Sequence, residues 1–250
     1  MIQLKNADQI AKMRDAGRIT GEALRLAGEH VKPGVTAKEL DDIIRRYIKK
    51  CGAEPSFLGY DGFPASACIS INEQVIHGIP SDLVVLRDFD LVKIDVGAYY
   101  KGFHGDSART FACGQVSEKA LKLMKTTEEC FRLAVKQLAP GARLGDVGYA
   151  VESHAIANGF SVVRKYIGHG VGQKLHEEPD VPNYGTPGRG LRLSTGMTFA
   201  IEPMVCENSS EVKVLPDGWT VVTADGGLSA HYEHTVALTE NGVEILTEID

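Results

Sequence analysis

Apolar and small residues near the start of the chain recur at alternating spacings of three and four positions. They are Ile10, Met13, Gly17, Thr20, Leu24, Ala27 and Val31, which form one buried stripe on a helix. Pro33-Gly34 ends this helix. A second stripe, made of Leu40, Ile43, Ile44, Tyr47 and Ile48, follows Thr36 and Glu39, whose spacing matches a capping box. The pattern predicts two consecutive helices, and Gly52 is suited to the C-cap of the second.

The same plan returns 107 residues later, since Thr127 corresponds to Thr20 without a gap. Eight positions are identical in the two segments: Thr20, Glu22, Arg25, Leu26, Ala27, Pro33, Gly34 and Gly52 match Thr127, Glu129, Arg132, Leu133, Ala134, Pro140, Gly141 and Gly159. Ordinary residue frequencies would give about two identities. Two unrelated helical hairpins would share a Pro-Gly turn as well. We favour an internal repeat, over about residues 10–111 and 117–240.

Alternating and β-branched residues predict strands in most of the remaining chain. The predicted strands are Ala67–Ile71, Asp90–Tyr99, Phe103–Phe111, Met197–Val205, Thr220–Ala224 and Tyr232–Leu238. Helices and strands do not alternate strictly, which favours an α+β fold over a doubly wound sheet. No composition change marks a linker, so we expect residues 1–250 to form a single domain.

The composition is that of an ordinary soluble protein, with 43% hydrophobic and 24% charged residues and a net charge of −6. It has no Lys/Arg-rich run, so neither DNA nor an anionic membrane is an expected partner. The five cysteines are widely spaced, include no CxxC pair and suit reduced thiols. The N-terminus lacks signal-peptide character and no apolar run could span a membrane, so we expect a cytoplasmic protein.

Carboxylates interrupt three of the predicted strands. Asp95 lies within Leu91-Val92-Lys93-Ile94-Asp95-Val96, Glu202 ends Phe199-Ala200-Ile201-Glu202, and Glu233 begins Glu233-His234-Thr235-Val236. One such residue is usually on a solvated strand face. Three together indicate a site, because burying an ionised carboxylate is costly unless a cation compensates.

Asp95 and Asp106 flank a probable hairpin around Tyr100-Lys101-Gly102. A two-residue loop at 100–101 places Asp95 directly opposite Asp106. A loop at 101–102 places them diagonally on the same face, whereas a three-residue loop without a bulge would separate them. Opposed like charges destabilise a sheet. A divalent cation between the two carboxylates would remove that repulsion.

A histidine, His169, lies in Gly168-His169-Gly170-Val171-Gly172. The glycine spacing is wrong for GxGxxG, and it suits close backbone approach to a metal or substrate. His176-Glu177-Glu178-Pro179 is not HExxH, and GxSxG is absent. Asp95, Asp106, Glu202, Glu233 and His169 exceed the three protein ligands of a single catalytic zinc. They suit two divalent ions, with Mn, Fe, Co or Zn preferred over soft metals.

Six motifs occur in order along the chain. They are His77-Gly78-Ile79-Pro80, Ile94-Asp95-Val96-Gly97, Gly102-Phe103-His104-Gly105-Asp106, Gly168-His169-Gly170, Ile201-Glu202-Pro203 and Glu233-His234-Thr235. Their combination resembles the type I methionine aminopeptidases over nearly the whole chain. The resemblance implies the pita-bread fold, with pseudo-two-fold symmetric halves and helices packed on a curved, mainly antiparallel sheet. It also implies hydrolysis of the initiator methionine from nascent proteins whose second residue is small.

The resemblance assigns a role to each site residue. Asp95 would chelate one metal ion, Asp106 and Glu233 would bridge both, and His169 and Glu202 would complete the second. Glu202 would also transfer the proton of the attacking water. His77 and His176 are expected to contact substrate and stabilise the tetrahedral intermediate. We expect a monomer that acts on the N-terminal methionine of nascent polypeptides, and a transient ribosome contact is compatible with that activity.

The methionine pocket implied by the resemblance uses Tyr60, Phe63, Cys68 and Trp219, together with His77 and His176. Aromatic rings make favourable contacts with a thioether. Phe57 and Leu175 stand where some relatives have Cys and Phe, and Phe63 can be Tyr in others. The pocket stays apolar, which preserves a preference for methionine and leaves its strictness open.

Two other interpretations remain. Prolidases and aminopeptidase P share the metal set but usually carry an extra N-terminal domain. Non-catalytic pita-bread proteins typically lose metal ligands, whereas all five are present in this sequence.

Overall fold

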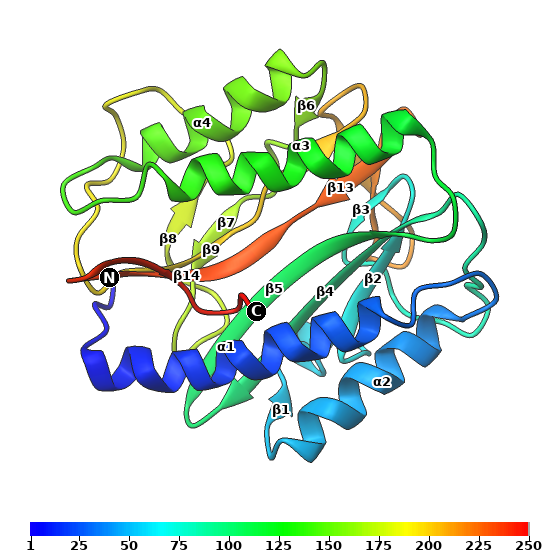
Figure 1. The fold of residues 1–250 in the computed structure, drawn as a ribbon, viewed down its shortest axis with the longest axis horizontal. Helices are drawn as coiled ribbons and strands as arrows, with labels where there is room; N and C mark the ends of the chain where they lie inside the picture. Colours follow the sequence, from blue (N-terminus) through cyan, green and yellow to red (C-terminus); the bar gives the residue numbers. More distant parts are fainter. Residues whose placement is uncertain (250) are drawn as a thin grey trace.

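A curved antiparallel sheet forms the centre of the molecule, and helices cover one of its faces (Figure 1). The computed structural model describes residues 1–249. Among these residues the sheet has nine strands, with the central order β1-β4-β5-β14-β9-β7-β8, while β2 pairs with β4 and β15 with β14. The strands are β1 (Glu54–Pro55), β2 (Ala67–Ile71), β4 (Leu91–Tyr100), β5 (Phe103–Ala112), β7 (Gly168–Gly170), β8 (Glu177–Val181), β9 (Thr198–Ile201), β14 (Glu233–Thr239) and β15 (Gly242–Ile245). The predicted α+β class and the antiparallel sheet are confirmed.

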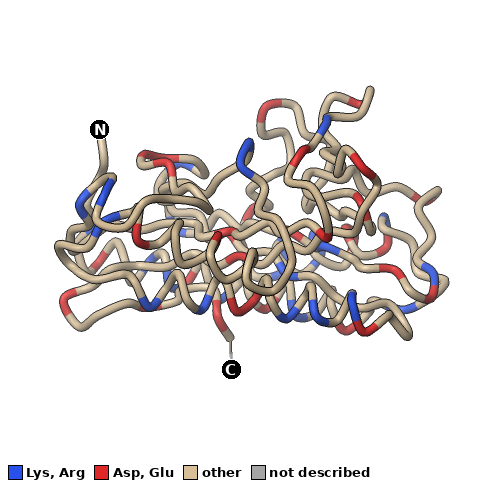
Figure 2. The backbone as a smooth tube through the Cα atoms, turned by 90° about the horizontal axis from the view of Figure 1, so that it is seen from above, with Lys and Arg blue, Asp and Glu red and all other residues tan. Residues whose placement is uncertain are grey.

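Two helix pairs pack on this sheet, α1 (Ala7–Gly28) with α2 (Ala37–Lys50), and α3 (Glu118–Val135) with α4 (Leu144–Ala157). The predicted capping box of α2 is confirmed, because Thr36 Oγ1 accepts from the Glu39 backbone N–H at 3.1 Å and Glu39 Oε2 accepts from the Thr36 N–H at 2.7 Å. Seen from above, the helices lie in one layer along which basic and acidic residues are interspersed (Figure 2).

Two smaller sheets complete the fold. Their strands are β3 (Gln74–Ile76), β6 (Ser161–Val162), β10 (Met204–Cys206), β11 (Val212–Val214), β12 (Val221–Thr223) and β13 (Ser229–His231), in the orders β13-β10-β6 and β11-β12-β3. A short 3₁₀ turn, η1 (Tyr60–Gly62), precedes β2.

The strand predicted over Met197–Val205 is wrong in one respect, because the structure divides it into β9 and β10 at Glu202-Pro203. Proline cannot donate a ladder hydrogen bond. The chain therefore leaves β14, the partner of β9, and pairs with β13 instead. This change of sheet places Glu202 in the gap between the two strands.

The core has two main parts, one under each helix pair. Leu24, Leu40, Ile44, Ile69 and Ile94 belong to the cluster between α1, α2 and the strands β2 and β4. Leu123, Phe131, Val147, Phe199 and Val236 belong to the cluster under α3 and α4. Each pair therefore anchors the strands directly beneath it.

The connection between the two helices of each pair makes the same backbone hydrogen bond in both halves of the chain. Gly34 N–H donates to Leu86 O at 2.8 Å, and Gly141 N–H donates to Leu193 O at 2.8 Å. Both glycines have a φ of 90°, a conformation that other residues rarely adopt. These matching positions support the proposed internal repeat.

Candidate metal centre and substrate pocket

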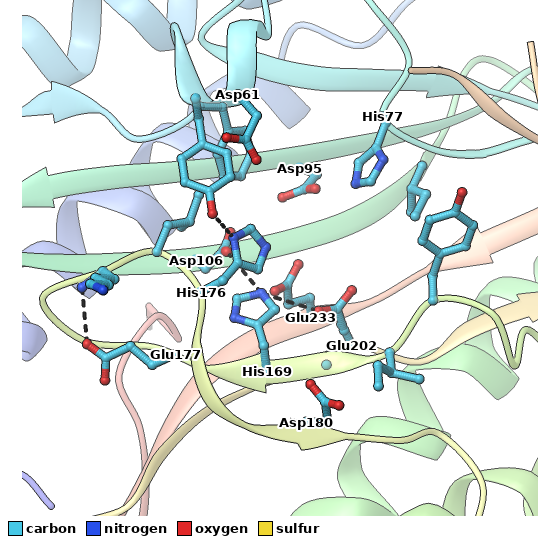
Figure 3. Close-up of a pocket in the computed structure, with 18 of the residues that line it drawn as sticks. Asp61, His77, Asp95, Asp106, His169, His176, Glu177, Asp180, Glu202 and Glu233 are labelled. Atoms are coloured by element: carbon cyan, nitrogen blue, oxygen red, sulfur yellow. Dashed lines mark hydrogen bonds and ion pairs between the residues drawn. The ribbon is translucent and has the colours of Figure 1, made fainter. Parts of the chain in front are cut away.

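Five neighbouring strands bring the predicted metal ligands together. Asp95 is on β4, Asp106 on β5 and Glu233 on β14, while His169 is on β7 and Glu202 directly follows β9. Ala108 of β5 pairs with both Asp95 and Glu233, so these two carboxylates lie at the same level of the sheet. Figure 3 shows the five side chains pointing toward one another.

The β4–β5 hairpin has its two-residue loop at Lys101 and Gly102. Tyr100 pairs with Phe103, and both loop residues have positive φ, 50° and 87°. Such a turn matches the twist of the strands. It pairs Asp106 with Gly97 rather than with Asp95. Of the two registers that keep the carboxylates on one face, the structure has the diagonal one.

Two hydrogen bonds to the backbone of Asp106 fix its position relative to β14. Its N–H donates to Thr235 Oγ1 at 2.9 Å, and its carbonyl oxygen accepts from the same hydroxyl at 2.9 Å. One threonine of β14 thereby ties β5 to the strand that carries Glu233.

The distances within the cluster exceed those of hydrogen bonds. His169 Nε2 lies 3.7 Å from Asp106 Oδ2 and 3.5 Å from Glu202 Oε1. Two atoms that each lie about 2.1 Å from one ion are roughly 3.0–4.2 Å apart, depending on the angle between them. The spacing therefore fits donors directed at a common ion.

The imidazole of His169 has the tautomer that a metal ligand needs. Its Nδ1 lies 2.9 Å from Gly170 O, a group that can only accept, so Nδ1 carries the proton and Nε2 has a free lone pair. Burial lowers the pKa of His169 to about 3, which keeps the ring neutral.

The four carboxylates are strongly perturbed. Burial raises the pKa of Asp106 to about 7. Burial, and secondarily the charge of Asp106, raises the pKa of Asp95, Glu202 and Glu233 well above the usual range. Asp95 Oδ1 and Asp106 Oδ1 are buried without a hydrogen-bond partner among the described residues. Buried oxygens of this kind need a compensating cation, so the donor set fits divalent metal ions.

A cavity of about 870 Å³ opens beside these carboxylates. Every predicted site residue lines it: Tyr60, Phe63, Cys68, His77, Asp95, Asp106, His169, His176, Glu202, Trp219 and Glu233. Residues far apart in the chain therefore converge on one space, and their roles remain predictions.

The two histidines predicted to contact substrate lie on the cavity wall. The His176 ring packs against that of His169 at an interplanar angle of 48°, with ring centroids 4.1 Å apart, and its Nδ1 is 2.8 Å from the Tyr60 hydroxyl. His77 has a φ of 60° and packs edge-on against Tyr166. Burial lowers the pKa of His77 to about 4. Burial lowers the pKa of His176 as well, so both side chains can face a substrate as neutral rings.

Apolar side chains line part of the cavity and form a recess. Phe57, Phe63, Cys68 and Leu175 are buried in a single cluster, and Trp219 packs edge-on against Phe63 with centroids 5.1 Å apart. The recess includes Phe57, Phe63 and Leu175, the three positions at which the sequence is expected to differ from some relatives.

Cys68 links the recess to the carboxylates. It pairs with Asp95 across β2 and β4, and burial, followed by the nearby Asp95 charge, raises the pKa of its thiol well above normal. The thiol is therefore protonated and acts as an apolar contact.

Gly168 and Gly170, which flank His169, do not have the role that the sequence predicts, namely close approach of the backbone to a metal or substrate. A Cβ at Gly168 would lie 2.3 Å from Ala200 O, and one at Gly170 would lie 2.3 Å from Glu178 O. These glycines let β9 and β8 approach β7, rather than exposing the backbone to a ligand. They contribute to the site by placing His169 against β9.

One site residue, His231, was missed in the sequence. It is 1% exposed, and its Nε2 lies 3.7 Å from Glu233 Oε2 and 3.8 Å from Glu202 Oε2. The spacing of His231 and Glu233 could have predicted its position, because residues two apart in an extended segment point to the same face. The predicted start of the strand at Tyr232 concealed it.

Comparison with known proteins agrees with this geometry. Residues 11–240 match metallopeptidase family M24. The chain belongs to this family. A methionine aminopeptidase of Clostridium perfringens is 55% identical over 249 residues, covering 100% of both chains. The solved M24 structure of methionine aminopeptidase from Thermotoga maritima superimposes with a TM-score of 0.98 at 45% identity, covering 100% of both chains.

The proline-directed branch of the family is more distant. Prolidase from Pyrococcus furiosus has a TM-score of 0.79 at 26% identity, and the match covers 99% of this chain but 66% of the prolidase. The sequence resemblance to methionine aminopeptidases and the pita-bread fold are thereby confirmed. As an M24 metallopeptidase, the chain uses divalent metal. None of the helices among residues 1–249 is both long and apolar enough to cross a membrane.

Proposed function

We propose that this chain is a two-metal aminopeptidase that removes the N-terminal methionine from polypeptides whose second residue is small. The observation that carries the proposal is the position of the apolar recess directly beside the buried carboxylates, within one cavity. A methionine side chain in the recess would place the first peptide bond near the carboxylates. Relatives 45% and 55% identical over the full chain, named methionine aminopeptidases, support the same activity.

The proposed ligands are Asp95, Asp106, His169, Glu202 and Glu233, with Asp106 and Glu233 shared by two ions of Co, Mn, Fe or Zn. Bound divalent ions would lower the pKa of water and stabilise negative charge on the peptide oxygen. The protein supplies the remaining functions through its own side chains.

The carboxylate of Glu202 would accept the proton of the attacking water and deliver it to the departing amine. Its backbone is held by Asn183 Nδ2, which donates to Glu202 O at 3.0 Å. Burial and neighbouring acids raise its pKa, which strengthens it as a base. We assign the Tyr60 hydroxyl as the donor to His176 Nδ1, which leaves the proton of the neutral ring on Nε2. His176 Nε2–H would then donate to the peptide carbonyl oxygen.

Hydrolysis of Met-Ala-Ser by chelator-treated protein, titrated separately with Fe, Mn, Co and Zn, tests this function. We expect turnover to require metal and to saturate when two ions are bound. An X-Pro peptide serves as the matched substrate for the prolidase branch. Cleavage of X-Pro in preference to Met-Ala-Ser would overturn the proposal.

The chemistry also suggests a setting. Nascent chains are made in the cytoplasm, so we propose a cytoplasmic monomer that meets its substrates at or near the ribosome. Co-sedimentation with ribosomes and light scattering of the purified protein test these two points.

A further inference from the structure

The His231 side chain lies against Glu202 and Glu233 of the carboxylate cluster. His231 ends β13, and Thr110 of β5 clamps its backbone, accepting from the His231 N–H at 2.9 Å and donating to its carbonyl oxygen at 2.9 Å. This clamp repeats the one that Thr235 makes to Asp106. The imidazole therefore has as firm a backbone support as an expected ligand.

The ring has no other partner to explain its burial. Neither Nδ1 nor Nε2 has a hydrogen-bond partner among residues 1–249, and the residue is 1% exposed. A polar group that is buried without a partner destabilises the folded protein. His231 Nε2 lies 3.8 Å from the carboxylate oxygen Glu202 Oε2 and 3.7 Å from Glu233 Oε2, and both distances are too long for hydrogen bonds.

These separations match those of His169, the expected imidazole ligand. Its Nε2 lies 3.5 Å and 3.7 Å from Glu202 and Asp106 oxygens. Donor atoms of Asp95, His231 and Glu233 lie within 4.8 Å of one another, as do those of Asp106, His169 and Glu233. The cluster thus contains two sets of three donors, each with one imidazole and both sharing Glu233.

We propose that His231 Nε2 is a ligand of the ion that Asp95 and Glu233 hold. The inference rests on the proposed two-ion centre and adds a sixth protein ligand to it. Each ion then has one nitrogen donor, His231 for one and His169 for the other. An imidazole favours Zn, Co and Fe over oxygen-preferring ions such as Mg, so the ion beside Asp95 should be selective as well as tightly held.

The variant His231→Gln separates a ligand from a positioning residue. Glutamine can still hydrogen-bond to Glu202 and Glu233, but it provides no imidazole nitrogen. Removing an outer partner of a metal ligand typically weakens binding about 10–100-fold. We expect His231→Gln and His231→Ala to weaken one of two Co(II) ions by more than about 100-fold, with the other retained.

Two controls accompany the titration. His169→Gln should weaken the other ion. His104→Gln alters a half-buried imidazole bonded to Ser56 Oγ at 2.8 Å, outside the cluster, and should leave both affinities unchanged. Thermal melts in chelator check that each variant folds, and X-ray absorption of the two-cobalt protein counts imidazoles, with two expected for wild type.

If His231→Gln binds both ions within tenfold of wild type, or wild type shows one imidazole per two ions, the proposal is overturned. Wild type that still hydrolyses Met-Ala-Ser would leave the proposed function intact in that case. Wild type that binds no ion and has no activity would overturn both.

Discussion

Asp106 lies diagonally across the β4–β5 hairpin from Asp95, because Asp106 pairs with Gly97 and Asp95 pairs with Ala108. The diagonal register keeps both carboxylates on the cavity face without placing them in direct opposition. Each has one buried oxygen without a partner among the described residues. Two unit charges about 5 Å apart repel by roughly 3 kcal/mol at an effective dielectric of 20, so the metal-free site should destabilise the fold.

Asp106→Asn should therefore raise the melting temperature of the metal-free protein while abolishing most activity. The substitution removes a charge and keeps the shape. With saturating Co or Mn the order should reverse, because ligand binding stabilises the wild type more. Thermal melts in chelator and then in metal measure both signs. A lower melting temperature for the variant in chelator at neutral pH would show that the carboxylates do not repel in a dry site.

The pH dependence of this effect has a definite sign. The folded pKa of Asp106 is about 7, raised from 3.8 by burial. A raised folded pKa gives stability that is complete below about pH 4 and is lost as the pH rises through 7. The difference in melting temperature between Asp106→Asn and wild type, both in chelator, should be small at pH 4 and grow up to about pH 7. A difference independent of pH would contradict the raised pKa.

Glu202→Gln should retain the fold and lose turnover. If Glu202 is both ligand and proton carrier, kcat for Met-Ala-Ser should fall by at least about 10²–10⁴. Glu178→Gln is the matched control, because this exposed carboxylate lines the same cavity without a proposed role, and kcat should change little. Near-normal kcat in a fully metallated Glu202→Gln would remove Glu202 from the proton transfer.

Trp219 should limit the size of the first side chain, since it is partly buried against Phe63 and the other residues of the apolar recess. Trp219→Ala should shift relative kcat/KM from Met toward Leu and Phe peptides by about 10–200-fold, corresponding to roughly 1–3 kcal/mol. Trp219→Phe keeps an aromatic wall and should shift selectivity less. Unchanged ratios in Trp219→Ala would place the methionine pocket elsewhere.

Gly105 allows α1 to pack directly on β5 beside Asp106. A Cβ at this position would lie 2.8 Å from Gly17 Cα and 2.9 Å from Thr20 Oγ1. Gly105→Ala should cost about 1–3 kcal/mol through overpacking, with a fall in melting temperature of roughly 2–4 °C per kcal/mol for a domain of this size. Gly105→Ser should cost more. Equal stability of all three proteins would mean that α1 moves away without cost.

Much of the local structure was determined by sequence near each element. The Thr36 capping box and the strand Ala67–Ile71 were predicted to the residue, because capping and alternation depend on neighbours a few positions away. The sequence predicts that Asp95 and Asp106 lie on one face of the hairpin, either opposite or diagonal to each other. It does not determine which two residues form the loop, and the loop decides between these two registers. The five expected ligands came from strand carboxylates and motif resemblance.

Tertiary structure decided which strands those carboxylates would join. The division of Met197–Val205 at Pro203 depends on β9 pairing with β14 and β10 with β13, and these pairings connect distant segments. They also bring His231 level with Met204 and close to Glu202. A single sequence shows alternation within each strand, but the neighbour of a strand is chosen by burial and backbone hydrogen bonding across the whole sheet. For that reason the sequence alone could predict the five proposed ligands, whereas the position of His231 beside Glu202 and Glu233 depends on the folded protein.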